Sequence, residues 1–470
     1  MSSHRIQLRR SRVARLVAAA LGSIVYTSGF TQGAAAQAPG QAPALARSTA
    51  ATLDDPLLAP PPPAPRMLSS WTDALAQVRL RSPDYLTTFH AVLRAEAQSQ
   101  VALAGILPSL SGSGSFTHQF FTTTQSLGDA PITIPAQDVF AAGAAFTWPL
   151  GDLRAWYAVG TGKRMVDVSN SELSERRRTI AKAIVSAMIA TLAATRAAEL
   201  ARNGLRGSHD RLALAEARIR AQSGTELDRD RAQEDVEAAR AVVVTADEAL
   251  RQSREALGLA LGDRVATSAP RDLDLAAFEQ AVASTCRVNQ SIEQRPDVIA
   301  ARQRLELAER SVRDVQLQYV PSLSLQSQVA WSTDVLYGPT ITWSMQGVLS
   351  VPLWDGGARA GVLRDARAAV AQSKAALDQV RLSAFVDAAQ AERAVRVTAT
   401  SLDIARRRRE LAVRVDQRTR DSYALGVATS VDLVTSGQAQ RAADINLAML
   451  EYEYTRTRTL AILSVADCTY

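Results

Sequence analysis

Four stretches of the chain alternate between apolar and polar residues with a period of two, which is typical of β-strands with different faces. One face of each is apolar and aromatic, as at Phe146 and Trp148, and the other carries mainly Ser, Thr, Gln, Gly or Ala, without Lys or Glu. Runs of about 11–13 residues are long enough for tilted strands to cross a bilayer. We therefore expect four membrane-spanning strands rather than four half-buried strands of a soluble sheet. The stretches cover residues 110–120, 140–150, 322–332 and 341–353.

Much longer segments show helical periodicity. One helix over 71–106 and a shorter one over 294–319 are predicted before the strand pairs, and helices over 155–222 and 357–422 after them. At ~1.5 Å per residue, about 67 residues span ~100 Å, which favours a projecting coiled coil over an ordinary bundle. Apolar and small residues recur every seven positions, at Val236, Val243, Leu250 and Leu257 and again at Leu363, Val370, Leu377, Ala384 and Ala391.

The landmarks occur twice in the same order, which indicates a duplication. The sequence LPSLS at Leu107 recurs as VPSLS at Val320, and WPLGD at Trp148 recurs as VPLWD at Val351. We expect a first strand and helical-hairpin repeat over residues 69–265, a connecting segment over 266–293, and a second repeat over 294–470.

The N-terminus has the three parts of a secretory signal peptide. Arginines are followed by an apolar run from Leu16 to Tyr26 and by small residues ending at Ala36. The apolar run is too short for a membrane anchor, which needs ~20 residues. We expect residues 1–36 to be removed and residues 37–68 to form a proline-rich linker.

The net charge does not indicate a nucleic-acid-binding protein. Of the formal charge of +6, five charges come from arginines within residues 1–36, which contain no Lys, Asp or Glu, so the remainder carries only +1. A nearly neutral chain has no global field that attracts DNA or RNA.

The few chemically reactive residues form no known catalytic or metal-binding motif. The histidines are His4, His90, His118 and His209, and none lies in an HExxH or a Cys/His zinc pattern. We therefore expect no enzyme activity, cofactor or metal. Cys286 and Cys468 could pair in an oxidising compartment or remain two isolated thiols, and the sequence leaves both alternatives open.

Four strands cannot close a barrel by themselves. An open sheet in hydrocarbon would leave unpaired backbone groups at both edges, so several chains must share one barrel. Two chains would give eight strands and an interior filled by side chains, whereas three would give twelve strands and a water-filled lumen. A homotrimer is therefore the preferred assembly.

Two glycine-containing turns interrupt the long helices, at Gly224 and at Gly426, 202 residues apart. Glycine allows the positive φ that ends a helix. The next helix can be capped by Thr225 in the first turn and by Thr429 or Ser430 in the second. Asp230 and Asp432, also 202 residues apart, fall just inside the following helices, where the helix dipole favours a carboxylate.

These motifs together resemble the TolC-type outer-membrane efflux protein family over about residues 70–465. The matching segments are Leu107–Leu110 and Val320–Leu323, which open strands, Trp148–Leu150 and Val351–Gly357, which close them, and the turn Tyr423–Leu433. The resemblance implies a mixed α and β fold with four transmembrane β-strands per chain in a trimeric 12-stranded barrel. Very long coiled-coil helices would form a periplasmic tunnel, and a periplasmic adaptor and an inner-membrane transporter would be partners.

The whole chain is most similar to outer-membrane components of type I secretion systems that export RTX toxins, together with an ABC transporter. The alternatives are an outer-membrane component of a small-molecule efflux pump and, in another class, a periplasmic coiled-coil adaptor. The resemblance also implies a gate in which Asp432 forms a ring of charges with Tyr423 nearby. The chain departs from the family at Thr435, where a second acidic ring is expected, and at Ala428, where a gating arginine is expected.

Overall fold

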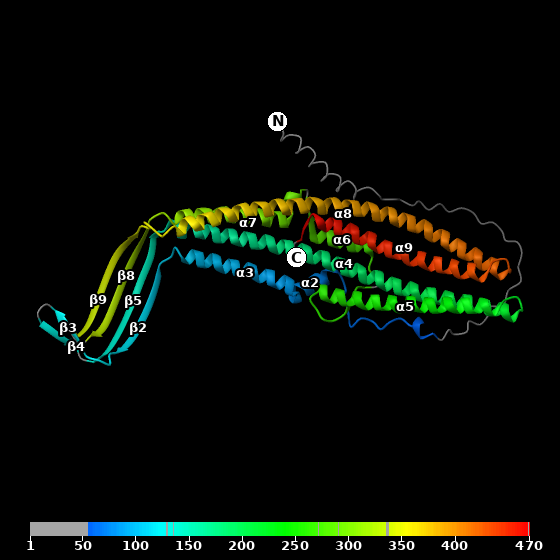
Figure 1. The fold of residues 1–470 in the computed structure, drawn as a ribbon, viewed down its shortest axis with the longest axis horizontal. Helices are drawn as coiled ribbons and strands as arrows, with labels where there is room; N and C mark the ends of the chain where they lie inside the picture. The colour runs from blue at the N-terminus through cyan, green and yellow to red at the C-terminus, as the bar shows by residue number, and fades with distance from the viewer. Residues whose placement is uncertain are drawn as a thin grey trace, which may run out of the picture. The chain divides into compact units, whose positions relative to one another are not determined.

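The computed structural model describes residues 55–470, apart from 128–129, 135, 271, 290, 335–337 and 469. The predicted signal peptide and most of the predicted linker lie outside the described residues. The described chain is mainly helical with several strands, as expected (Figure 1). It forms two compact units, and each unit takes segments from both sequence repeats: one contains residues 87–174 and 296–382, and the other contains the rest.

The first unit contains a four-stranded antiparallel sheet in the order β2-β5-β8-β9 (Figure 1). The strands are β2 (Ser109–His118), β5 (Asp138–Gly151), β8 (Ser322–Asp334) and β9 (Gly338–Ser350). All four predicted strands are therefore present. The last one begins and ends three residues earlier than predicted, because its ladder with β8 runs from Gly338, opposite Asp334, to Ser350, opposite Ser322, the first residue of β8.

The register confirms the two predicted faces of this sheet. Phe116 lies opposite Phe140 on the apolar face, and Gln326 lies opposite Gln346 on the polar face. Ser327 is a polar residue on the apolar face, and the indole N–H of Trp343 donates to its hydroxyl at 3.0 Å. The pairing thus assembles one continuous apolar surface and one continuous polar surface from four separate stretches of sequence.

A small hairpin of β3 (Thr123–Leu127) and β4 (Ala130–Ile134) lies between β2 and β5. The sequence indicated only a longer connection at this place. Each strand has just five residues, too few for a clear period of two.

The predicted helix over 71–106 is wrong, because two helices occupy this region: α2 (Trp71–Arg81) and α3 (Pro83–Ala104). Ser82 between them has an extended backbone, with φ −69° and ψ 116°. Pro83 disfavours a helical conformation in the residue before it, so the helix ends there and a new one begins at the proline.

The helices next to the sheet pack through small residues and stacked arginines. A Cβ on Gly162 of α4 (Leu153–Arg220) would lie 3.1 Å from the Cα of Ser99, so α3 and α4 approach closely. On the other side, α7 (Pro296–Leu317) places the Arg310 guanidinium 4.2 Å from the centre of the Tyr157 ring. The range of α7 agrees with the prediction to within two residues at each end.

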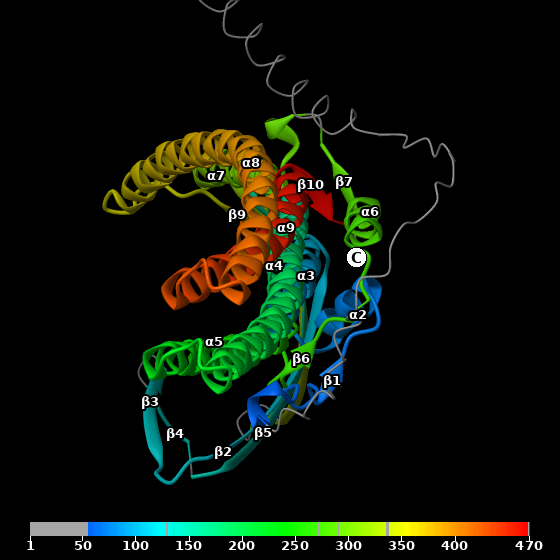
Figure 2. The same ribbon diagram turned by 90° about the vertical axis from the view of Figure 1, so that its right-hand side faces the viewer.

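The second unit contains the hairpin ends of the long helices. α4 is followed by α5 (Glu226–Ala260), and α8 (Ala358–Ala424) by α9 (Ser430–Ser464) (Figure 2). The predicted heptad seam of α5 is buried, with every apolar member at most 2% exposed. It packs against Ala201 and Leu205 of α4, which confirms the coiled-coil interpretation of this hairpin.

Short elements complete this unit: η1 (Pro56–Leu58), α6 (Leu275–Thr285) and η2 (Ile292–Gln294). Strand β1 (Arg66–Met67) pairs in parallel with β6 (Thr267–Ser268). Strand β7 (Cys286–Val288) pairs with β10 (Ala466–Cys468), which brings the two cysteines opposite each other.

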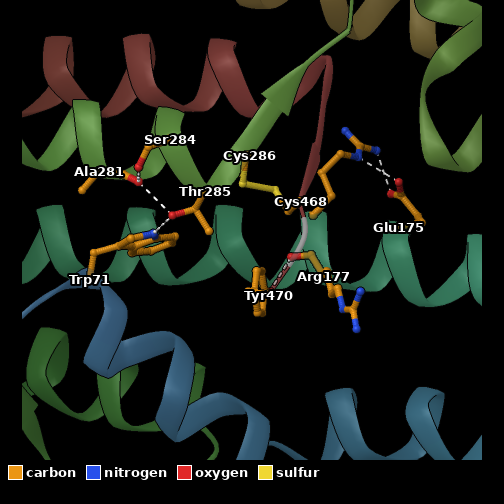
Figure 3. The surroundings of a disulfide bond; sticks show 10 residues. Trp71, Glu175, Arg177, Ala281, Ser284, Thr285, Cys286, Cys468 and Tyr470 are labelled. Atoms are coloured by element: carbon orange, nitrogen blue, oxygen red, sulfur yellow. Dashed lines mark hydrogen bonds and ion pairs between the residues drawn. A yellow bond between two sulfur atoms is a disulfide. The ribbon is translucent and has the colours of Figure 1, made fainter.

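Cys286 and Cys468 form a disulfide, which decides between the two alternatives that the sequence left open (Figure 3). Both cysteines are fully buried. Beside them, the Tyr470 hydroxyl donates to the Arg177 carbonyl at 2.7 Å, and the Trp71 indole donates to the Thr285 hydroxyl at 3.2 Å (Figure 3). The C-terminal end of the chain is thus fixed to both the connecting segment and α4.

Candidate functional site at the hairpin tips

The two helical hairpins turn with the same backbone geometry. At the first tip, the N–H of Ser223 donates to the Arg218 carbonyl at 2.9 Å, and at the second, the N–H of Val427 donates to the Ser422 carbonyl at 2.9 Å. This six-residue closure is the Schellman arrangement, which places one residue in the left-handed region. That residue is Gly426 in the second tip, with φ +78°.

The positive φ predicted at Gly224 is wrong, because Gln222 takes this conformation instead, with φ 55°. Gly224 is needed for close approach, since a Cβ there would lie 3.1 Å from the Arg218 Cβ. The structurally equivalent pair is therefore Gln222 and Gly426, 204 residues apart, and the alignment of the two glycines was shifted by two residues.

Both following helices begin with a complete capping box, as the threonines predicted. The Asp228 amide donates to the Thr225 hydroxyl at 3.3 Å and its carboxylate accepts from the Thr225 N–H at 3.0 Å. Asp432 and Thr429 repeat these contacts at 3.2 and 3.0 Å. The counterpart of Asp432 is thus Asp228 and not Asp230, again at an offset of 204.

These contacts determine the charge of the tip carboxylates. The hydroxyl and N–H of Thr429 both donate to Asp432, and they lower its pKa. Asp432 is therefore ionised at neutral pH while its side chain remains exposed. Asp230 is exposed as well, and pairs with Arg229 at 3.2 Å.

A clasp joins the two tips through Tyr423 and Arg218. The Arg218 guanidinium lies 4.4 Å from the centre of the Tyr423 ring and donates to the Tyr423 carbonyl at 3.0 Å. Tyr423 is only 1% exposed, and its burial and the nearby Asp228 raise its pKa. An arginine from the other hairpin therefore contacts the tyrosine, although Ala428 stands where the family resemblance implies one.

A buried carboxylate, Asp235 of α5, joins the hairpins deeper in the unit. Arg211 of α4 donates to it at 3.1 and 3.2 Å, and Arg441 of α9 at 3.0 and 2.5 Å. Gln438 adds a hydrogen bond at 3.2 Å. Burial alone would raise the pKa of Asp235, but the arginines outweigh burial and lower it. The group is a charged cross-link between three helices.

The sequence analysis missed this cluster, although two glycines mark it. A Cβ on Gly437 would lie 2.5 Å from the Arg211 Cζ, and one on Gly204 would lie 2.6 Å from the Arg441 Cδ. Each glycine leaves room for an arginine to cross the neighbouring helix. Glycine inside a long helix is otherwise unfavourable, so these positions could have indicated a close approach.

The described residues contain no group of three or more His, Cys, Asp or Glu side chains arranged to hold a metal ion. Of the histidines, His4 lies outside the described residues, and His209 pairs with Asp55. α4 has one stretch with the length and composition of a membrane span, but 56% of it is buried, as in the core helix of a soluble protein.

Comparisons with known proteins agree with this architecture. The sequence model of the family described as outer membrane efflux protein matches residues 74–263 and 288–461, one segment in each repeat. No curated protein sequence matches significantly.

Solved structures have the same fold at low sequence identity. The chain is 18% identical to CusC, a transmembrane channel, with a TM-score of 0.72 over 86% of this chain and 99% of that one. For the Campylobacter jejuni outer-membrane channel CmeC, the sequence identity is 15% and the TM-score 0.71, over 83% of this chain and 84% of that one. For the Vibrio cholerae outer-membrane protein VceC, the sequence identity is 16% and the TM-score 0.71, over 84% of this chain and 95% of that one.

The family match covers well over half of the sequence and follows its duplication, and the strand and helix plan is that of the solved channels. The alternative of a periplasmic adaptor is thereby set aside. The chain belongs to the outer membrane efflux protein family, a family of outer-membrane channels whose fold joins membrane strands to long periplasmic helices.

Proposed function

We propose that three copies of the chain form one twelve-stranded channel through the outer membrane. The observation that carries this proposal is the pair of sheet edges: within the described chain, β2 and β9 each pair with only one strand. Unpaired backbone groups in hydrocarbon are costly. Because the sheet has an even number of alternating strands, β9 of one copy can continue antiparallel into β2 of the next.

The two faces of the sheet support this placement. Large apolar side chains are exposed on one face, including Ile341 at 76% and Trp343 at 73%, which water would disfavour and lipid would accept. Exposed aromatic residues lie near both ends of the strands, at Phe120 and Phe121 and at Trp156 and Trp354. Aromatic girdles at both interfaces are typical of membrane barrels.

A stripe on α8 supports assembly outside the sheet. Val386, Val397, Ile404, Leu411 and Val415 are all at least 40% exposed. Spacings of 11, 7, 7 and 4 residues keep them on one side of a helix. A second copy is the occupant that this proposal requires, because a stripe of that length would continue the packing of the hairpins into a closed tunnel wall.

Cross-linking tests the assembly. Each variant carries two new cysteines, one in place of Ser113 in β2 and one at a position of β9, and successive β9 positions are tried in turn. In outer-membrane fractions, disulfides should form between neighbouring chains and give dimers and trimers but no larger species. A variant with cysteine only at Ser113 is the control. A soluble monomer, or cross-links that extend beyond the trimer, would contradict the proposal.

For the cargo, we propose an exported protein toxin, delivered by an inner-membrane ABC transporter through a periplasmic adaptor. The polar face of the sheet has no charged residue between Val139 and Pro149, between Leu323 and Thr333 or between Pro339 and Leu349. A lining without fixed charge does not discriminate against either sign along a polypeptide. The alternative is small-molecule efflux, which the family's description favours.

Deleting the gene separates these cargoes. Loss of toxin from the culture medium with unchanged sensitivity to antibiotics and dyes supports protein export. Increased sensitivity with normal toxin secretion supports small-molecule efflux. Neither result changes the assembly, which the cross-links test separately.

At the tips, we propose that Asp432 from three copies forms a charged ring, with Tyr423 and Gly426 shaping the turn behind it and Gly224 and Asp230 at the neighbouring tip. Such a ring would favour cations and bind divalent ions. Asp432→Ala should reduce cation selectivity and the block by divalent ions in planar bilayers, and Glu451→Ala, at an exposed carboxylate of α9 outside the tips, is the control. Unchanged single-channel currents in Asp432→Ala would reject the ring.

We also propose that residues 1–36 are a signal peptide, and that the repeats span 69–265 and 294–470. Sequencing the N-terminus of the mature protein tests the first point, with Gln37 expected as the first residue.

A further inference from the structure

The proline-rich segment Asp55–Met67, here called the strap, is bound along the α4–α5 hairpin. The sequence indicated only a linker at this place. In the structure its first residue is 8% exposed, and its last two residues form strand β1 against β6 (Figure 2). The strap therefore has a defined path with contacts from end to end.

An acidic residue anchors the start of the strap. Asp55 accepts from Arg240 of α5 at 3.0 Å and lies 3.1 Å from His209 of α4. The same side chain accepts the Leu57 N–H at 3.0 Å and so caps the turn η1. Burial would raise the pKa of Asp55, but these hydrogen bonds lower it, so the anchor is ionised at neutral pH.

Apolar residues follow the anchor. Leu57 and Leu58 pack against the core formed by Ala201, Leu205 and the seam of α5 at Val236 to Val243. The two leucines thus cover an apolar surface between the helices that is not closed by the helices themselves.

Buried arginines then bind the backbone of the strap. The Arg202 guanidinium donates to the Ala59 carbonyl at 3.0 Å and is held by Asp247 at 2.6 Å. Arg254 donates to the Pro62 carbonyl at 2.9 Å. Both arginines are less than 10% exposed. Because prolines have no N–H, the strap offers only acceptors here, and donors from the helices match them.

The contacts keep a constant register between the strap and α5. Beyond the turn η1, from Ala59 to Pro62, the strap advances 3 residues, or ~9 Å at ~3.1 Å per residue of polyproline helix. The matching partners on α5 are Asp247, which holds Arg202, and Arg254; they are 7 residues apart, or ~10 Å at ~1.5 Å per helical residue. Arg66 and Asp263 form an ion pair at the far end. The extended proline-rich part of the strap therefore stays in register with α5.

We propose that the α4–α5 hairpin carries a built peptide-binding groove, specific for an extended, proline-rich peptide with an acidic residue at its start, and that the strap is its resident ligand. The acidic anchor, the two leucines and the run of carbonyl groups each bind a separate part of the groove. The proposal is independent of the cargo and of the number of copies in the channel.

A peptide in trans tests the groove directly. A variant of the whole chain that lacks only residues 55–65 should bind a fluorescent peptide of the sequence 55–65, and the wild-type protein, whose groove is filled, should bind this peptide at least tenfold more weakly. The same peptide with Asp55→Asn should lose at least tenfold in affinity, since a charge-assisted contact is absent. Equal binding to both proteins, or no binding to a folded deletion variant, would overturn the proposal.

A second measurement uses the intact strap, in case the deletion variant does not fold. Asp55→Asn and Leu58→Asp should each increase hydrogen exchange at least fivefold in the part of α5 around Val236–Val243. Pro63→Ala, at an exposed strap position, is the matched control and should leave exchange unchanged. If all three variants exchange like the wild type, the strap is not a bound ligand.

Discussion

The two helical hairpins have nearly the same helix lengths, but their apolar faces are covered in different ways. α4 and α8 have 68 and 67 residues, and α5 and α9 have 35 each. Between residues 175 and 220, α4 exposes no large apolar side chain, whereas the stripe on α8 exposes several. The strap covers one apolar face of the first hairpin, although α5 still exposes Val242 and Val244, and the second hairpin has a surface suited to another copy of the chain.

The ends of the two repeats are also held differently. A strap that is bound noncovalently runs along the first hairpin, whereas the disulfide between Cys286 and Cys468 closes the second repeat into a loop. A duplicated unit can thus keep its backbone plan while its two copies acquire different partners, because an apolar face must be covered but its cover is not prescribed.

The largest expected effect comes from the α8 stripe. Ile404→Asp should abolish the proposed trimer, because it places an unpaired charge on a surface that the proposed assembly buries. Light scattering in detergent measures the oligomer. Arg406→Asp, exposed and ~200° around the helix, is the control and should remain trimeric. A trimeric Ile404→Asp variant would show that the stripe is not an interface.

Removing the disulfide should have the next largest effect. The bond joins residues 182 positions apart, and replacing both cysteines by alanine should lower the free energy of unfolding by up to ~5 kcal/mol in the chain-entropy description. Urea unfolding with and without reductant measures this loss. Reductant should weaken the wild type to the level of the double variant, and an unchanged midpoint would be the contrary result.

Asp235→Asn should destabilise the contact between the hairpins by about 3–5 kcal/mol, because it leaves two arginines with no carboxylate. Hydrogen exchange should increase in α5 and α9. Asp230→Asn, an exposed position on the same helix, should change stability by less than about 0.5 kcal/mol. Similar effects of the two substitutions would rule out a buried charged cross-link.

A smaller effect is expected from exchanging the turn residues. Gln222→Gly should stabilise the first hairpin by about 1 kcal/mol, because its left-handed conformation costs a residue with a side chain 1–2 kcal/mol. Gly426→Gln should destabilise the second by a similar amount. The midpoints of thermal unfolding of the two variants should therefore shift in opposite directions. Shifts in the same direction would contradict the structural equivalence of Gln222 and Gly426.

The smallest expected effect is the loss of helix capping by Asp432 at acid pH. The pKa of Asp432 is lowered in the folded protein, so its capping contribution is complete above the ordinary carboxyl pKa of ~4 and is lost as the pH falls through the lower folded value. The protection factor of the first turn of α9, which is the hydrogen-exchange rate corrected for the intrinsic pH dependence of amide exchange, should be constant from about pH 5 to about pH 7 and should decrease below pH ~4. Thr429→Ala should remove this dependence.

The sequence predicted the elements whose signal is repeated many times. Eleven or more alternating residues located each long strand and its two faces, and the heptads located the seam of α5. The break at Ser82 was also visible in principle, because Pro83 follows it. The tips were predicted less well, since two glycines suggested an offset of 202 where the backbone repeats at 204.

Sequence alone determined the periodic features, because an apolar face recurs at every turn or every second residue and tolerates no shift. Tertiary structure decided the contacts made once: the disulfide, the three-helix cluster at Asp235, the clasp of Arg218 on Tyr423, and the strap along α5. Each depends on two distant residues meeting at a distance of a few ångströms. No local pattern encodes such a meeting, because it is fixed only when the long helices have packed.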